Sequence, residues 1–291
     1  MNTYSEISTG DRARELLEDF DVLATRRCMA LVPRQGEEDS LKQNVQAALA
    51  ASSVHLKSLD YARKRYVEQG RSGTSTDAHV PYVEAYKLAK NHVRQNIRRL
   101  RTNGRPDPTV GVFGASLALE RLPASFFCAH FMYRMGHKYE GHAVSRLILE
   151  QIAWAFAAHV SDDMAYIERI EATRAIGGLK TFLPEAGRLY GFLSTKTHID
   201  FSSHDEFLKV EDGKNFVLHA HPNFEEFAHV MLTLADMFAL VWEVSQVEYL
   251  DELESIHRGT DGLSLVPRSS RPFLTTIEEQ MQRLRQPAGD A

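Results

Sequence analysis

The sequence predicts an all-α protein, a helical bundle with one short β-hairpin near residues 207–219. Apolar residues recur at three- and four-residue spacing through most of the 291 residues, which is the periodicity of amphipathic helices. Glycine and proline clusters separate these stretches, as at Gly70–Gly73 and Gly104–Pro108. The sequence contains no Gly-x-x-x-x-Gly-Lys phosphate loop and no Gly-x-Ser-x-Gly elbow, which argues against familiar α/β enzymes.

In chain order, the apolar spacing predicts helices over residues 11–32, 41–69, 79–102, 124–135, 138–160, 163–175, 179–196, 223–256 and 275–285. The hairpin is expected from Phe207–Val210 and Asn215–His219, which alternate in polarity on either side of Asp212-Gly213. Val110–Gly114 is too isolated for a nucleotide loop and is expected to lead into the next helix.

Three regions are expected from composition. Residues 1–105 form a basic amphipathic helical region, and residues 115–257 carry the denser apolar core with the hairpin. Residues 258–291 are predicted to be a lightly packed linker and a short C-terminal helix, which is too short to be stable without docking.

The composition is that of a soluble protein, with 43% hydrophobic residues, 25% charged residues and a net charge of -5. Met1–Thr9 lacks the basic and apolar regions of a signal peptide, and Glu150 and Asp236 interrupt the most apolar stretches. We therefore predict a cytoplasmic protein with no membrane partner. Cys28 and Cys128 lack metal-ligand spacing and are expected to be buried thiols in a reducing compartment.

Charge is unevenly distributed along the chain. Residues 57–105 contain twelve Lys/Arg and four Asp/Glu, a local excess of +8, whereas residues 222–257 contain eight Asp/Glu and no Lys or Arg. One interpretation is an RNA-binding surface formed by Arg94, Arg98, Arg99, Arg101 and Arg105. The other, which charge runs favour in general, is that the basic helices pack beside the acidic one and the charges compensate.

Two helical segments place ionisable groups four residues apart on one face. His142, Arg146 and Glu150 follow one another in the predicted helix 138–160, which is apolar nearly all round and therefore expected in the centre of the bundle. Ser194 and His198 have the same spacing in a second helix, with Tyr190 one turn earlier, and Asp200 and His204 just past its end. We expect the two helices to be neighbours, because buried ionisable groups need polar partners.

The Arg-x-x-x-Glu of Arg146 and Glu150, the Tyr-x-x-Leu-Ser-x-x-x-His of residues 190–198, the short hairpin and the long apolar helix together resemble bacterial families related to the HEPN superfamily (higher-eukaryote and prokaryote nucleotide-binding domains). The resemblance covers roughly residues 120–250. It implies a bundle of four or five helices, a homodimer, and RNA as a partner. In many members it also implies metal-independent RNA cleavage in toxin or phage-defence systems.

Under this resemblance, His198 would transfer the proton of the ribose hydroxyl and Arg146 would stabilise charge on the phosphate. Glu150 would hold the guanidinium, Ser194 would orient the imidazole, and Lys196 would contact phosphate. This sequence departs from the nuclease pattern in one respect. Active members carry Arg and His on one helix with four to six residues between them, and no Arg here precedes a His at that spacing.

Two alternatives to catalysis stay open. In the first, the protein is a non-enzymatic interaction protein, and Arg146, Glu150, Tyr190, Ser194 and His198 form a structural hydrogen-bond network. In the second, the same region binds a small ligand or nucleotide.

No metal and no cofactor is predicted. Glu226-x-x-His229 and Glu254-x-x-His257 match the half-site of di-iron bundles. On one predicted helix, however, they would lie about 40 Å apart. The cluster of His137, Glu140 and His142 is expected to be a solvated helix start.

Overall fold

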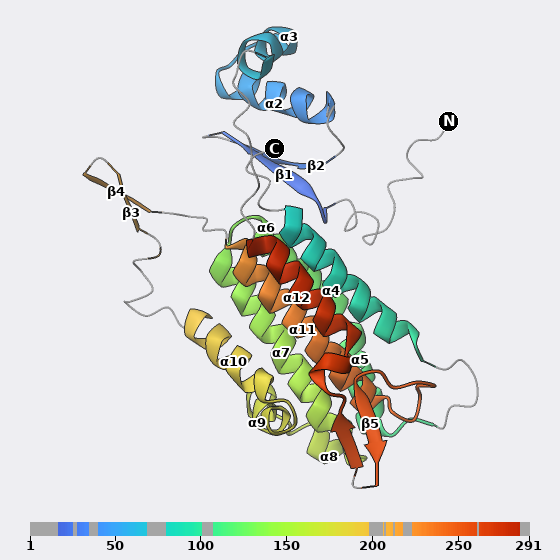
Figure 1. Ribbon diagram of the computed structural model, residues 1–291. Coiled ribbons are helices and arrows are strands. Elements are labelled where there is room, and N and C mark those ends of the chain that lie inside the picture. The colour runs from blue at the N-terminus through green and yellow to red at the C-terminus, as the bar shows by residue number, and fades with distance from the viewer. Residues whose placement is uncertain are drawn as a thin grey trace. The chain divides into compact units, whose positions relative to one another are not determined.

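The computed structural model describes residues 17–25, 28–34, 40–68, 80–100, 107–197, 206, 208–211, 213–217, 223–260 and 262–285. The chain divides into two compact units, Met1–Asp77 and Ala78–Ala291. The described residues are mostly helical, with three short antiparallel strand pairs, so the predicted all-α class is confirmed (Figure 1).

Within the described part of the first unit, a β-hairpin is present where the sequence predicted a helix over residues 11–32. Strands β1 (Phe20–Ala24) and β2 (Met29–Pro33) pair in antiparallel register. The backbone N–H of Thr25 donates to the carbonyl of Cys28 at 2.8 Å, which closes the turn between them. The prediction was wrong because a short apolar run fits the helical and the strand period equally well.

The helix predicted over residues 41–69 is divided into three pieces, α2 (Ser40–Ser53), α3 (Leu59–Ala62) and the π-helical turn η2 (Arg63–Glu68). His55 has a φ of 56°, in the left-handed region that ends a helix, and Ser58 caps α3 by accepting from the N–H of Tyr61.

The second unit is a helical bundle built around α11 (Phe224–Ser245), most of whose residues are buried. Along it pack α4 (Val80–Arg98), α7 (Lys138–Ala158) and α12 (Pro272–Arg285) (Figure 1). Helix α7 also contacts α5 (Val110–Glu120), α6 (Leu122–Arg134), α9 (Ala172–Phe182) and α10 (Pro184–Thr197). Its predicted central position is confirmed.

Helix α5 begins where the sequence predicted only a lead-in, because Thr109 caps it by accepting from the N–H of Val112. The helix predicted over residues 163–175 is replaced by the single turn α8 (Met164–Ile167), and α9 begins at Ala172. The hairpin of β3 (Leu208–Glu211) and β4 (Lys214–Val217) forms as predicted, with Gly213 at a φ of 73° in its turn.

Helix α11 ends at Ser245, eleven residues before the predicted boundary at residue 256. The carboxylate of Glu243 is fully buried and accepts hydrogen bonds from the backbone N–H groups of Glu254 and Ser255 at 2.8–3.1 Å. These bonds hold the following loop against the helix end, so packing overrides the helical pattern of the sequence.

Where the sequence predicted a linker, the chain forms β5 (Ile256–Gly259), β6 (Gly262–Leu265) and the 3-10 turn η5 (Arg268–Ser270). The C-terminal helix α12 docks on the bundle, as its length requires. The ring of Phe273 stacks on that of His92 with centroids 3.6 Å apart, and Gln280 donates to the carbonyl of Pro81 at 2.7 Å.

Two helical stretches are long and apolar enough to cross a membrane by length and composition, Val110–Arg134 and Phe224–Ser245. The second is the core helix α11, in which 89% of the most apolar stretch is buried. The first comprises α5 and α6, in which 28% of the corresponding stretch is buried. Cytoplasmic location stays a prediction. The expectation of buried cysteines is wrong, since Cys128 is exposed and Cys28 is half-buried in the turn between β1 and β2.

Candidate functional site

The Arg146 cluster, defined as Arg146, Glu150, Tyr190 and Thr197, joins α7 to α10. Arg146 donates from Nε to Glu150 at 2.8 Å, from Nη2 to the Tyr190 hydroxyl at 3.0 Å and from Nη1 to Thr197 Oγ1 at 3.3 Å. The predicted contacts of Arg146 with Glu150 and Tyr190 are therefore confirmed. Partial burial is the largest single influence and would lower the pKa of the Arg146 guanidinium, but the hydrogen bonds and charges of Glu150 and Tyr190 together outweigh it and raise that pKa.

Ser194 does not contact Arg146 directly. Its hydroxyl is buried without a hydrogen-bond partner among the described residues, while its carbonyl accepts from the Thr197 hydroxyl at 3.2 Å. Thr197, which the sequence motifs did not indicate, contacts Arg146. His198, Asp200 and His204 lie outside the described residues, so their predicted roles stay predictions.

The predicted RNA-binding arginines are placed only in part, since Arg101 and Arg105 lie outside the described residues. Arg94 and Arg98 are on α4, which packs along the acidic helix α11. Arg99 forms an ion pair with the buried Glu243 at 2.8 Å and lies 3.5 Å from Glu254. At Arg99, basic and acidic regions therefore compensate each other, as the second interpretation of the charge pattern proposed.

A chain of hydrogen bonds in the bundle interior links α6, α7 and α11. The Tyr133 hydroxyl lies 2.9 Å from Ser145 Oγ and 2.9 Å from His142 Nδ1, and His142 Nε2 lies 2.9 Å from Glu226 Oε1. Gly141 permits this approach, because a Cβ there would lie 2.3 Å from the Tyr133 ring. Sequence reasoning missed Tyr133 and Ser145.

The order of protons in this chain follows from the charge of Glu226. Burial alone would raise the pKa of that carboxyl, but the hydrogen bond from His142 and the charge of Lys138 lower it. Because a carboxylate only accepts, His142 donates from Nε2. With a neutral imidazole, Nδ1 then accepts from the Tyr133 hydroxyl, which in turn accepts from Ser145.

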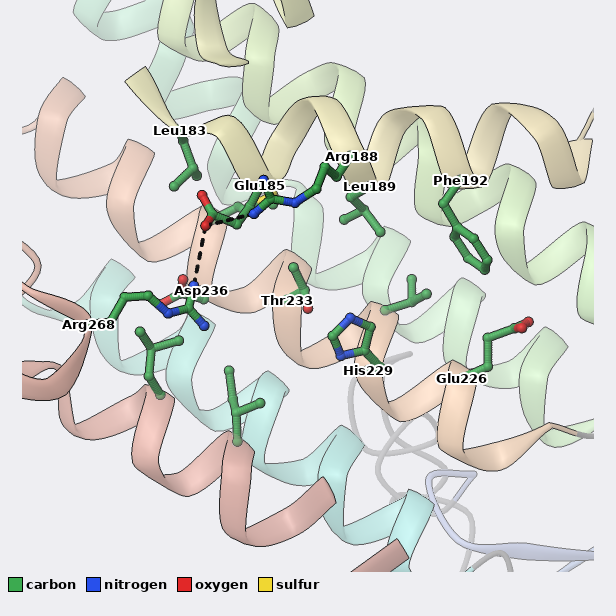
Figure 2. A pocket seen from close by; sticks show the side chains of 14 residues that line it. Leu183, Glu185, Arg188, Leu189, Phe192, Glu226, His229, Thr233, Asp236 and Arg268 are labelled. Atoms are coloured by element: carbon green, nitrogen blue, oxygen red, sulfur yellow. Dashed lines mark hydrogen bonds and ion pairs between the residues drawn. The ribbon is translucent and has the colours of Figure 1, made fainter. Parts of the chain in front are cut away.

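A cavity of about 660 Å³ lies between α10, α11, α12 and the turn η5, and we call it the α10–α12 pocket (Figure 2). Apolar side chains from all three helices form much of its wall, among them Leu189, Phe192, Val230, Met237, Leu274 and Ile277. Glu226 lies at one end of this wall, so the buried hydrogen-bond chain ends at the pocket.

The charged groups beside this cavity are unevenly neutralised. Arg188 and Arg268 both contact the same oxygen of Glu185, at 3.0 Å and 3.5 Å (Figure 2). Their side chains are 70% and 61% exposed. Two guanidinium groups therefore share one carboxylate, which leaves a net positive charge at this side of the pocket.

A sealed ion pair borders the same cavity. Arg271 Nη1 lies 3.1 Å from both carboxylate oxygens of Asp236, and both side chains are nearly buried. Burial raises the pKa of Asp236, and the positive charge of Arg271 opposes that rise. Asp236 is thus already paired and adds no free charge to the pocket.

His229 and Thr233 lie side by side on the face of α11 that looks toward α10 (Figure 2). Burial, assisted by the positive charge of Arg285, lowers the pKa of His229 below its ordinary value. The neutral imidazole has one donor and one acceptor nitrogen, and the threonine hydroxyl can do both. These two side chains can therefore orient a polar group of a ligand.

One pattern in the sequence marks this pocket, the pair Glu226 and His229 on a strongly apolar helix, but its spacing indicates only a metal half-site. His257 lies on β5 rather than on α11, so the expectation of one helix carrying both half-sites was wrong. Among the described residues, no group of three His, Cys, Asp or Glu side chains is arranged to hold a metal ion.

Comparisons of this chain with protein-family models, curated proteins and solved structures found no match. The resemblance to the HEPN superfamily therefore stays a prediction from sequence motifs.

Proposed function

We propose that the protein binds a small organic anion with an apolar body in the α10–α12 pocket. One observation carries the proposal: an apolar-walled cavity of about 660 Å³ has two largely exposed guanidinium groups, those of Arg188 and Arg268, sharing a single carboxylate. Cavities of roughly 300–1,000 Å³ with few, well-placed polar groups are typical of small-molecule sites.

The charge of the ligand follows from the charges that remain after pairing. The charge of Asp236 is matched by Arg271, and that of Glu226 by Lys138. Among the described residues, Glu185 is the carboxylate in contact with both Arg188 and Arg268. An anionic ligand group would add the missing negative charge, and guanidinium groups bind carboxylates and phosphates with paired hydrogen bonds.

The apolar body follows from the wall. Leu189 and Phe192 on α10 face Val230 on α11, and Leu274 and Ile277 cover the cavity from α12. Each square ångström of apolar surface that a ligand buries there contributes about 25 cal/mol. His229 and Thr233 lie between these apolar side chains and would select ligands with a hydrogen-bonding group in the middle of the molecule.

A binding role is consistent with the non-enzymatic alternative from the sequence. Every guanidinium nitrogen of Arg146 already has a partner in Glu150, Tyr190 or Thr197. The predicted RNA cleavage needs this guanidinium for phosphate. Incubation of the protein with mixed RNA in chelator, beside His198→Ala, tests that rival, and cleavage that depends on His198 would favour it over our proposal.

Decanoate and its neutral analogue decanol provide the direct test of the pocket. We expect decanoate to bind the protein more tightly than decanol in isothermal titration calorimetry. Arg188→Ala combined with Arg268→Ala should weaken decanoate binding about tenfold, equal to the loss of about 1.4 kcal/mol, and leave decanol unchanged.

Tryptophan substitutions locate the binding. Ile277→Trp should fill the pocket and abolish binding of both probes. Glu278→Trp, an exposed position on the same helix, is the matched control and should bind as the unaltered protein does. Equal binding by the two tryptophan variants would exclude this pocket as the site.

A further inference from the structure

Three hydrogen-bond donors converge on the carboxylate of Glu206. Lys196 Nζ lies 2.8 Å from Oε1, while Lys138 Nζ and the Tyr139 hydroxyl lie 2.9 Å and 3.0 Å from Oε2. Both oxygens of the carboxylate are therefore held. The donors come from the first turn of α7 and the last turn of α10, whereas Glu206 lies outside both helices.

The three donors lie on helices that belong to the bundle. Helices α7 and α10 pack against each other, and the Lys138 side chain is only 6% exposed. Lys138 also lies 3.5 Å from Glu226, a pocket residue. A nearly buried ammonium group needs an anion beside it. Negative charge is therefore stabilised where the first turn of α7 meets the last turn of α10.

The charges show how strongly an anion is held here. Hydrogen bonds from Lys196 and then Lys138 lower the pKa of Glu206 to about 2. The bond to Glu206 in turn raises the pKa of Lys196. Without the Glu206 carboxylate, the two ammonium groups would have Glu226 as their one acidic neighbour among the described residues. An oxyanion is the species that fits two ammonium groups and a phenol hydroxyl.

We infer that Lys138, Tyr139 and Lys196 form an oxyanion-binding site that Glu206 fills in this structure and that an external carboxylate or phosphate can occupy in its place. The site lies next to the α10–α12 pocket but is separate from it. The inference therefore goes beyond the proposed function and stands or falls independently of it.

Chemical rescue of Glu206→Ala tests the inference on the full chain. The variant should melt at a lower temperature than the unaltered protein in chloride, because two ammonium groups lose their anion. Added acetate or phosphate, at an ionic strength matched with sodium chloride, should raise its melting temperature by about 2 °C in a saturable way. The unaltered protein should show no such saturable rise.

Two further variants make the rescue specific. Glu225→Ala removes the carboxylate from the exposed ion pair with Arg285 and should show no saturable response. Glu206→Ala combined with Lys196→Ala should respond much less than Glu206→Ala alone.

The rescue experiment distinguishes between carboxylate and phosphate as the occupant of the site, and it can also overturn the inference. Saturation by acetate alone assigns the site to carboxylates, and tighter saturation by phosphate assigns it to phosphate groups. A response of Glu206→Ala no larger than that of Glu225→Ala overturns the inference. A variant that remains unfolded at every oxyanion concentration also overturns it, because the added anion must then be unable to replace the lost carboxylate.

Discussion

The Arg146 cluster and the α10–α12 pocket both contain arginine on or beside α10, yet they differ in how fully that arginine is neutralised. Arg146 is 21% exposed and each of its guanidinium nitrogens has a partner. Arg188 and Arg268 are mostly exposed and share one oxygen of Glu185. A saturated cluster holds helices together, whereas unsaturated charge beside a cavity is available to a ligand.

The sealed ion pair of Arg271 and Asp236 should give the largest effect on stability. Arg271→Met leaves the Asp236 carboxylate nearly buried without its cation, and we expect the free energy of unfolding to fall by about 3 kcal/mol. Urea denaturation measures this. The double variant Arg271→Met, Asp236→Leu should recover most of the loss, and a loss below about 0.5 kcal/mol in the single variant would mean the pair is not sealed.

The loss of stability in Arg271→Met should also depend on pH. Burial raises the folded-state pKa of Asp236 above its ordinary 3.8. A raised folded pKa favours folding at low pH and disfavours it as pH rises through the folded value. The loss in Arg271→Met should therefore shrink as pH is lowered toward the ordinary range of aspartate.

Arg146→Met tests whether the Arg146 cluster stabilises the fold. We expect a fall of about 1.5 kcal/mol in the free energy of unfolding, because Glu150 and Tyr190 lose a charged hydrogen-bond partner in a partly buried place. Arg174→Met, in an exposed pair with Glu171, is the control and should change little. If Arg146→Met instead kept its stability but lost an RNA-cleaving activity of the unaltered protein, the catalytic interpretation would be favoured.

Glu206→Gln should have a smaller effect that depends on pH. The folded pKa of Glu206 is about 2, below its ordinary 4.5, so the stabilisation is present above pH 4.5 and is lost as pH falls toward 2. Since Glu206 is partly exposed, we expect a difference below about 1 kcal/mol at neutral pH. Urea denaturation at pH 7 and at pH 3 checks this, and a difference that grows at low pH would contradict it.

Arg188 and Arg268, the two largely exposed arginines of the pocket, should contribute least to the free energy of unfolding. Arg188→Ala and Arg268→Ala, made singly, are expected to change the free energy of unfolding by less than about 0.5 kcal/mol, because both side chains are largely in water. Thermal and urea denaturation measure this. A large destabilisation would show that these arginines are structural and would remove the main support for the pocket as an anion site.

Particular residues show where sequence reasoning succeeded and failed. Arg146 and Glu150 are four residues apart on one helix, so their contact follows from helical geometry. The contact of Thr197 with Arg146 was not predicted, because helical periodicity indicates which turn faces a neighbouring helix but not which residue makes the contact. Glu206 and Lys138 are 68 positions apart, and no local pattern connects them.

The sequence by itself determined the helical class, the central place of α7, the docking of the C-terminal helix and the ion pair within α7. These depend on apolar periodicity and on neighbours three or four positions apart, which are fixed by helix geometry. Only the tertiary structure decided the α10–α12 pocket, the oxyanion site and the early end of α11. Each of these depends on how side chains from distant segments fill the space between packed helices, and such packing has no local signature in the chain.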